Sequence, residues 1–236
     1  MDATYWHKQS ATAPLYSDLI WSRPENRAQA GKLLILSGSA AGFSVAGQAY
    51  GAAQDAGVVR VVLPELLRRT VPKELKFELD FAPSVAHGSF AKKALNDLLI
   101  HANWADAVLL PGGIGRNSET SALLEQFVQK YTGLLVIAED ALDVFIEVPK
   151  LLFERENTVV VVDFSQLQKM WHKLTRGESV IKFDTPLQLF VEQMHTFSKE
   201  VPVGIITHHQ GVLLAAYGGE VSTTPSKEKI GRVTTA

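Results

Sequence analysis

The sequence contains no cysteine among its 236 residues, and this absence excludes several kinds of chemistry. Disulfide bonds, thiolate nucleophiles and cysteine-ligated metal sites all need a residue type that is missing. A chain without cysteine fits a reducing compartment, so we expect a cytoplasmic protein.

The sequence also has little net charge and no long hydrophobic run. Its formal net charge of −2 gives no electrostatic reason to expect nucleic acid or an acidic membrane as a partner. Residues 1–22 lack the apolar stretch of a signal peptide. No apolar run approaches the roughly 20 residues that cross a bilayer. We therefore expect a soluble protein with neither a nucleic-acid nor a membrane partner.

What is present is the composition of an ordinary globular protein. Hydrophobic residues make up 46% of the chain and charged residues 20%, which allows a sizeable core. The length suits one large domain, and the sequence shows no internal repeat, low-complexity tract or linker. We predict a single domain over residues 1–236, with residues 1–30 as an N-terminal extension packed on it.

Short apolar runs alternate along the chain with stretches of helical spacing. The predicted strands are residues 33–36, 58–63, 107–110, 134–138, 159–162, 203–207 and 212–216. The first five are apolar throughout, which is typical of parallel strands covered on both faces by helices. The last two flank residues 208–211 and predict an antiparallel hairpin at an edge of the sheet.

Three stretches carry the i, i+3, i+4, i+7 apolar pattern of one helix face. These are Ala91, Ala94, Leu95 and Leu98; Leu124, Phe127, Val128 and Tyr131; and Leu187, Phe190, Val191 and Met194. Thr185 and Pro186 are expected to supply the cap and first turn of the third helix. The alternation of strand and helix predicts an α/β fold with a mainly parallel, doubly wound sheet flanked by helices.

A glycine-rich segment, residues 37–47, directly follows the first predicted strand. Small residues let backbone N–H groups approach a ligand, and the next helix N-terminus favours an anion. The P-loop spacing is present, but Gln48 and Ala49 replace its lysine and Ser/Thr, so a P-loop is excluded. A tight strand-to-helix turn is the alternative. The candidate ligand contacts are Gly38, Ser39, Gly42, Phe43 and Gly47.

A second glycine-rich segment, residues 110–117, follows another predicted strand and leads into a helix capped by Asn117 or Ser118. Gly113 and Gly115 match part of the dinucleotide-binding fingerprint, but its third glycine is absent. Ligands of open α/β sheets bind outside the carboxyl ends of the strands. Two such turns on neighbouring strands therefore predict one shared ligand site.

Carboxylates follow two further strands, and each has two interpretations. Asp140 follows residues 134–138, and Asp163 follows residues 159–162. Either side chain could hydrogen-bond a ligand hydroxyl or a water on Mg²⁺, or could cap the next helix.

The seven histidines are scattered and do not predict a metal site. His208 and His209 are adjacent, and neighbouring residues of a strand point to opposite faces. No HExxH zinc motif and no GxSxG nucleophile elbow is present. Trp171 is interpreted as a core or lid aromatic.

Taken in order, these segments resemble the ADP/ATP-dependent NAD(P)H-hydrate dehydratases, a branch of the ribokinase-like superfamily. The resemblance covers roughly residues 20–236 and is more specific in the first half. The matching segments are Arg23-Pro24, residues 31–39 with Ser37 in place of a glycine, Gly42-Phe43 with Gly47, residues 105–116 with Pro111 and Gly112 transposed, and residues 139–142. Residues 163–166 retain nothing of the family's His-Pro-Gly-Glu.

The resemblance implies a ribokinase-like fold and a definite reaction. Family members phosphorylate the ring hydroxyl of NAD(P)H hydrate from ADP or ATP with Mg²⁺, and loss of the phosphate restores the cofactor. It also implies substrate contacts at the two glycine-rich turns, Asp140 and Asp163, and nucleotide contacts at His208, Gly231 and Arg232. Small-molecule nucleotides are then the expected partners, and a homo-oligomer is expected as in the family.

The C-terminal segment departs from the family pattern. A Gly-Thr-Gly-Asp loop supplies the anion hole and the aspartate base in the family. Gly231 matches, but Arg232 stands where the aspartate is expected. Glu228 is another candidate base, and Arg232 could bind phosphate as a cation. We therefore expect weak or absent dehydratase activity. A ribokinase-like small-molecule kinase and a non-catalytic nucleotide-binding relative are the alternatives.

Overall fold

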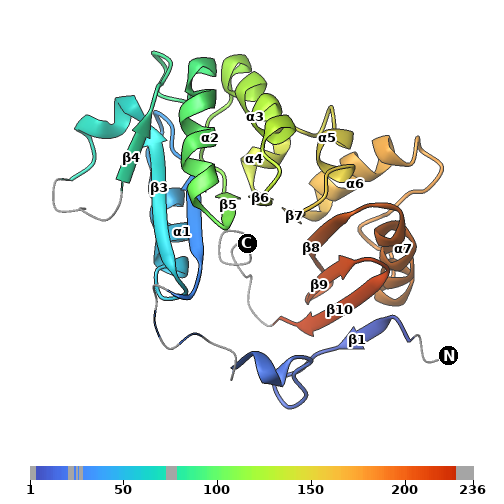
Figure 1. The fold of residues 1–236 in the computed structure, drawn as a ribbon. Helices are drawn as coiled ribbons and strands as arrows, with labels where there is room; N and C mark the ends of the chain where they lie inside the picture. The colour runs from blue at the N-terminus through green and yellow to red at the C-terminus, as the bar shows by residue number, and fades with distance from the viewer. Residues whose placement is uncertain (1–3, 21–23, 25, 27–28, 73–78, 227–236) are drawn as a thin grey trace.

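The computed structural model describes residues 4–20, 24, 26, 29–72 and 79–226. Its strands are β1 (Trp6–Lys8), β2 (Lys32–Leu36), β3 (Val58–Pro64), β4 (Leu79–Ala82), β5 (Ala107–Leu110), β6 (Leu134–Ala138), β7 (Thr158–Val162), β8 (Val203–His209), β9 (Val212–Tyr217) and β10 (Glu220–Pro225). They form one sheet in the order β1-β10-β9-β8-β7-β6-β5-β2-β3-β4 (Figure 1). The seven strands from β4 to β8 in this order are parallel, as the apolar runs predict.

The predicted hairpin is confirmed in the C-terminal part of the sheet. Strand β9 runs antiparallel to β8, and the turn between them is Gln210 and Gly211, with φ of 47° and 76°. Two residues with positive φ make the tight turn that suits a twisted hairpin. His208 is exposed and His209 is 3% exposed, so the two side chains lie on opposite faces. Strands β10 and β1 continue the sheet beyond this hairpin.

The helices are α1 (Ser44–Ala53), α2 (Leu95–Trp104), α3 (Ser118–Lys130), α4 (Asp140–Asp143), α5 (Lys150–Phe153), α6 (Phe164–Leu174) and α7 (Leu187–Glu200). Short 3-10 helices are η1 (Ser17–Ile20), η3 (Glu65–Arg69) and η4 (Lys92–Ala94). Asn117 caps α3 as predicted, because its side chain accepts from the Thr120 N–H at 2.9 Å. Helix α7 begins after Pro186, and Thr185 instead accepts from the Lys182 N–H at 3.0 Å. Its predicted start was therefore one residue early.

The two faces of the sheet are covered unequally. A large core joins the sheet to α2, α3, α6 and α7, and Trp171 lies within it, 3% exposed. On the other face, buried residues of α1 pack with β2, β3 and β5 in a smaller core. Beyond that core, Val159, Ile206 and Ala215 remain partly exposed on their strands. The prediction of helices over both faces therefore holds for the β2–β3–β5 half, where α1 lies opposite α2 and α3.

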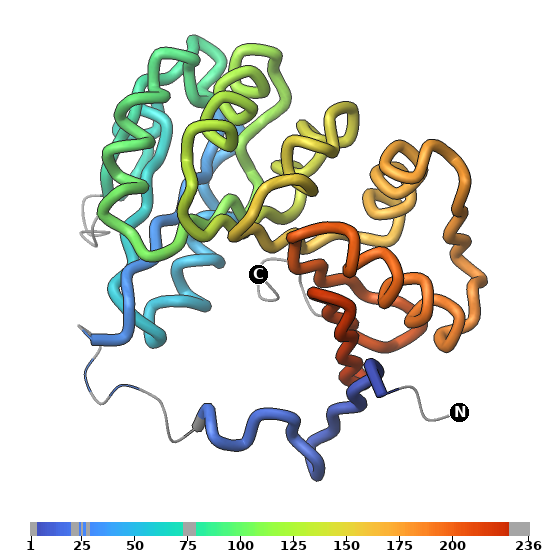
Figure 2. The backbone as a smooth tube through the Cα atoms, turned by 45° about the vertical axis from the view of Figure 1, so that its right-hand side comes forward, coloured from blue at the N-terminus to red at the C-terminus, as the bar shows by residue number. Residues whose placement is uncertain are grey.

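The N-terminal residues join the C-terminal strands. Strand β1 pairs in parallel with β10, and the Trp6 indole N–H donates to Thr223 Oγ1 at 2.9 Å. Figure 2 shows this N-terminal strand beside the C-terminal strands, far from β2 in space. Across the ranges that the structure describes, no helix has the length and apolar character of a membrane span.

Candidate functional site

Four loops meet at the carboxyl ends of β2, β5, β6 and β7, which are neighbours in the sheet. We call them the loop junction: residues 37–42, 111–116, 139–143 and 163–166. Ser37 is fully buried, and its hydroxyl donates to the Gly112 carbonyl at 2.5 Å. The predicted convergence of the two glycine-rich turns on one edge of the sheet is therefore confirmed.

Several junction glycines are required by contacts within the protein. A Cβ atom on Gly113 would lie 3.1 Å from Val45 Cβ, and one on Gly38 would lie 3.0 Å from Pro64 Cδ. A Cβ atom on Gly115 would overlap Ser89 Oγ and lie 3.2 Å from Ser39 Cβ. All three have positive φ, which favours glycine. Their backbones thus pack closely against neighbouring segments of the chain, and the tight-turn interpretation explains their residue type.

Gly42 and Gly47 differ, because a Cβ atom on either would meet no atom of the described residues within 4 Å. Gly42 closes a turn in which it exchanges two backbone hydrogen bonds with Ser39, at 2.8 and 3.1 Å. Gly47 lies inside α1 and is exposed. Space beside these two glycines is available to a ligand.

The N-terminus of α1 adds backbone donors to this part of the junction. Phe43 occupies the cap position and provides no side-chain hydrogen bond to the first turn. The Phe43 ring packs against the smaller core. The first-turn N–H groups of α1 therefore keep the partial positive charge that favours an anion.

Asp140 ties the third loop to the second. Its Oδ1 accepts from the Gly113 N–H at 2.6 Å, and Asp140 is the first residue of α4. The N-cap position belongs to Glu139, whose φ of 54° and ψ of −139° are rare for a residue with a side chain. Such strain concentrates at functional sites. Through its hydrogen bond to the Gly113 N–H, Asp140 holds the glycine-rich turn and does not cap α4; its role toward a ligand or Mg²⁺ stays a prediction.

A further polar network links the third and fourth loops. Asp143 accepts from Arg116 at 3.1 Å and from Gln166 Nε2 at 2.8 Å. Gln166, 5% exposed, also donates to the Glu139 carbonyl at 2.9 Å. Sequence reasoning missed Ser37, Asp143 and Gln166 as site residues. The one available signal was the Asp163-x-x-Gln166 spacing, which is that of a capping box.

Asp163 caps α6, as one of its two interpretations predicts. Its Oδ1 accepts from the Gln166 N–H at 2.7 Å, and the Gln166 side chain accepts from the Asp163 N–H at 3.2 Å. This reciprocal pair is a complete capping box. The role of Asp163 toward a substrate stays a prediction.

Substitution of Asp163 separates these two roles. Asp163→Ala is expected to lower the free energy of unfolding by about 1 kcal/mol, because the cap is lost. Asp163→Asn keeps an acceptor oxygen and should retain most of that stability, measured by urea denaturation. Unimpaired affinity for the predicted substrate in a stable Asp163→Asn variant would show that the carboxylate serves the helix alone.

Of the predicted nucleotide-binding and catalytic residues, the structure describes only His208. His208 lies near the end of β8 with its side chain exposed. Glu228, Gly231 and Arg232 lie outside the described residues, as does Arg23. His209 is a core residue whose Nε2 lies 2.7 Å from the Thr185 carbonyl and whose ring stacks on Phe164.

No group of three or more metal-ligating side chains occurs in the described ranges. Magnesium usually keeps several waters and binds through one or two carboxylates together with substrate phosphates. Asp140 uses one carboxylate oxygen for Gly113. The other oxygen of Asp140, together with waters and the phosphates of a nucleotide, would therefore fit the usual ligand set of a magnesium ion.

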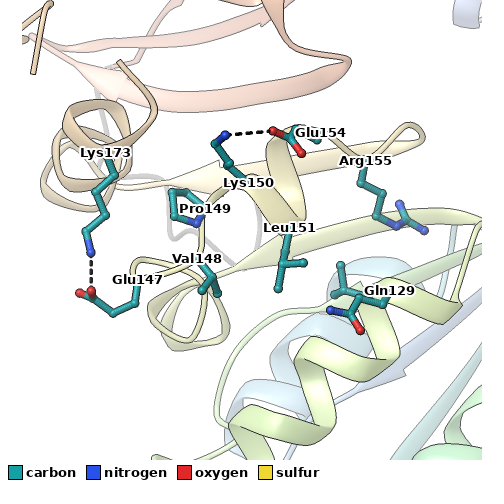
Figure 3. Close-up of a pocket in the computed structure, with 10 residues that line it drawn as sticks. Gln129, Glu147, Val148, Pro149, Lys150, Leu151, Glu154, Arg155 and Lys173 are labelled. Atoms are coloured by element: carbon teal, nitrogen blue, oxygen red, sulfur yellow. Dashed lines mark hydrogen bonds and ion pairs between the residues drawn. The ribbon is translucent and has the colours of Figure 1, made fainter. Parts of the chain in front are cut away.

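A hollow beside α3 and α5 does not belong to the junction (Figure 3). Its charged side chains already have partners: Lys173 pairs with Glu147, and Lys150 lies 3.6 Å from Glu154. Arg155 donates to carbonyls of Tyr131, Gly133, Glu156 and Asn157. Burial lowers the pKa of Arg155 and raises the pKa of Tyr131. These contacts stabilise the fold.

Comparison with known proteins identifies the fold. No protein-family model matches the sequence, and no curated protein matches it. A ribokinase-like superfamily protein from Enterococcus faecalis aligns with 95% of this chain and 73% of its own, with a TM-score of 0.66 and 14% identity. The hypothetic protein SMU.573 of Streptococcus mutans aligns with 86% of this chain and 68% of its own, with a TM-score of 0.56 and 17% identity. YxkO of Bacillus subtilis, a member of the UPF0031 family, aligns with 87% of this chain and 69% of its own, with a TM-score of 0.57 and 12% identity. The chain has a ribokinase-like α/β fold.

Proposed function

We propose that the loop junction binds the hydrated nicotinamide cofactor, and that the chain is an NAD(P)H-hydrate dehydratase-like protein dependent on ADP or ATP. The contact between the two glycine-rich turns, through Ser37 and Gly112, is the observation that carries this proposal. It puts the motifs of the resemblance at one edge of a ribokinase-like sheet. A homo-oligomeric, single-domain protein is part of the proposal.

The proposed substrate site is the open part of the junction. Gly42 and the first-turn N–H groups of α1 would receive an anionic group of the cofactor. Asp140 would hold a nucleotide-borne Mg²⁺ through its second oxygen while keeping Gly113 in place. Bound magnesium supplies charge stabilisation to the transferred phosphoryl group. His208, Gly231 and Arg232 are the proposed nucleotide contacts.

The general base that the proposed reaction needs is replaced in this sequence. Arg232 occupies the place of the aspartate in the resemblance, and Glu228 is the neighbouring carboxylate. Loss of a general base typically costs about 10²- to 10⁴-fold in rate. Dehydratase turnover is therefore proposed to be slow. The replacement by Arg232 favours a second candidate, a nucleotide-binding relative without catalysis, because arginine retains phosphate affinity.

A third candidate is a ribokinase-like kinase for a small hydroxylated substrate. The similar fold of YxkO, for which a kinase activity has been suggested, supports it. A kinase would release a phosphorylated product, whereas a dehydratase would also eliminate the phosphate. The product therefore separates the two activities.

Regeneration of NADH from its hydrate, with ADP or ATP and Mg²⁺, tests the proposal. We expect slow turnover and a rise in melting temperature with nucleotide, since a ligand of the folded state stabilises it by mass action. Asp140→Asn keeps an oxygen for Gly113 but removes the charge, so it should weaken the Mg²⁺-dependent part of nucleotide binding. Stabilisation without turnover would favour the non-catalytic relative. If nucleotide gave neither stabilisation nor turnover, all three candidates would be contradicted.

A further inference from the structure

Three buried side-chain atoms in the described part of the chain have no hydrogen-bond partner: Trp171 Nε1, Gln193 Oε1 and Thr207 Oγ1. Buried polar groups are nearly always hydrogen-bonded, so each of these atoms calls for an explanation. Trp171 and Gln193 line the same surface groove between α6 and α7. One is a donor and the other an acceptor.

The groove, which we call the α6–α7 groove, has a volume of about 740 Å³. This lies in the roughly 300–1,000 Å³ range of ligand sites. Aromatic residues line it: the ring centroids of Trp171 and Phe197 are 4.3 Å apart, and those of Phe197 and Phe153 are 5.8 Å apart. Trp171 is 3% exposed. A ligand would meet apolar rings together with a buried indole N–H.

Negative charge lines the same groove. Four carboxylates, Glu154, Glu178, Glu192 and Glu200, face two cations, Lys150 and Arg176, so the lining carries a net charge of −2. Lys150 is already paired with Glu154 at 3.6 Å. Within the residues that the structure describes, no ion pair engages Glu178, Glu192 or Glu200. A cationic partner complements this surface.

The α6–α7 groove is separate from the loop junction. Helix α6 starts at the junction with its cap Asp163 and ends at Leu174, which lines the groove. Val201 and Pro202, also in the lining, precede the amino end of β8. The groove thus extends toward the opposite end of the sheet from the proposed substrate site, and its ligand does not depend on the proposed function.

We propose that the α6–α7 groove binds an extended basic peptide segment of a partner protein. A residue in an extended chain presents its N–H and its C=O on the same side. The C=O would accept from Trp171 Nε1, and the N–H would donate to Gln193 Oε1. Apolar side chains would pack on Phe197 and its neighbours, and lysine or arginine side chains would meet the unpaired glutamates.

Fluorescence anisotropy with a labelled Ac-Leu-Arg-Leu-Arg-NH2 peptide tests this proposal on the full chain. We expect saturable binding below about 1 mM peptide. Trp171→Phe retains an aromatic ring without the N–H, and Gln193→Met retains bulk without the acceptor. Each is expected to weaken binding about 3- to 10-fold. Gln188→Met on the exposed side of α7 and Trp104→Phe in α2 are matched controls and should bind as the unsubstituted protein does.

Two peptide controls use the unsubstituted protein and therefore do not depend on the stability of any variant. A Leu-Glu peptide should not bind, and a peptide N-methylated at its second and third residues should bind more weakly because it lacks the donor for Gln193. Absence of binding at 1 mM would overturn the proposal. Equal binding of the N-methylated peptide, or of the folded Trp171→Phe and Gln193→Met variants, would also overturn it, as attraction to the glutamates alone would then suffice.

Discussion

Gly112→Ala is expected to lower the free energy of unfolding by about 3–5 kcal/mol, combining backbone strain with steric overlap. Gly112 has a φ of +105°, and a Cβ atom there would lie 2.6 Å from both Glu139 Cβ and Asp140 Oδ1. Neither neighbour can withdraw easily, because Glu139 is in a strained turn and Asp140 holds the Gly113 N–H. Urea denaturation with circular dichroism measures the loss.

Gly42→Ala is the matched control for this prediction. Its φ of +118° resembles that of Gly112, but within the part of the chain that the structure describes, a Cβ atom there has no neighbour closer than 4 Å. The alanine variant should therefore lose only about 1–2 kcal/mol from the unfavourable φ. Similar losses in both variants would show that loop contact at Gly112 adds nothing to the cost of positive φ.

Arg155→Met is expected to lower the free energy of unfolding by about 3–4 kcal/mol, because three partly buried oxygen atoms lose a charged donor together. Its guanidinium reaches the Tyr131 carbonyl at 2.5 Å, the Gly133 carbonyl at 2.6 Å and Thr158 Oγ1 at 2.7 Å. These groups join the end of α3 to the start of β7. Thermal and urea unfolding of the variant check the loss.

Two further variants control this prediction. Lys150→Met removes an exposed cation whose Glu154 partner is 3.6 Å away, and it should change stability by less than about 0.5 kcal/mol. Arg155→Lys keeps the charge but not the planar fork, so it should recover less than half of the lost stability. If the Arg155→Met protein is as stable as the unsubstituted protein, water replaces the guanidinium as hydrogen-bond donor to these carbonyls without loss of stability.

The strands that could be predicted are those whose state follows from their own apolar residues. The parallel strands at residues 107–110 and 134–138 have the predicted bounds, since a short apolar run buried on both faces has few alternatives. Strand β10 is polar, with Ser222, Thr223 and Thr224 in its centre, and its extended state depends on pairing with β9. Strands β1 and β4 are too short to show a period.

For the candidate site, too, one part could be predicted from the sequence and another could not. Its position could be predicted because parallel strands bring their carboxyl ends to one edge of the sheet, and the glycines mark the turns there. The contacts of Asp143 with Arg116 and Gln166 could not be predicted. These residues are 23 and 27 positions away along the chain, and only the assembled sheet brings them together.

The unequal covering of the sheet has a consequence for how the molecule meets its surroundings. Where α1 does not cover the sheet, the described residues Gly204, Ala215 and Ser222 form a surface of small residues, and Tyr217 beside them is 64% exposed. Small residues leave space above the sheet, so we expect a hydrophobic dye to reach the apolar side chains of this surface. A melting curve followed with such a dye should therefore show a raised signal on the folded protein, before the unfolding transition begins.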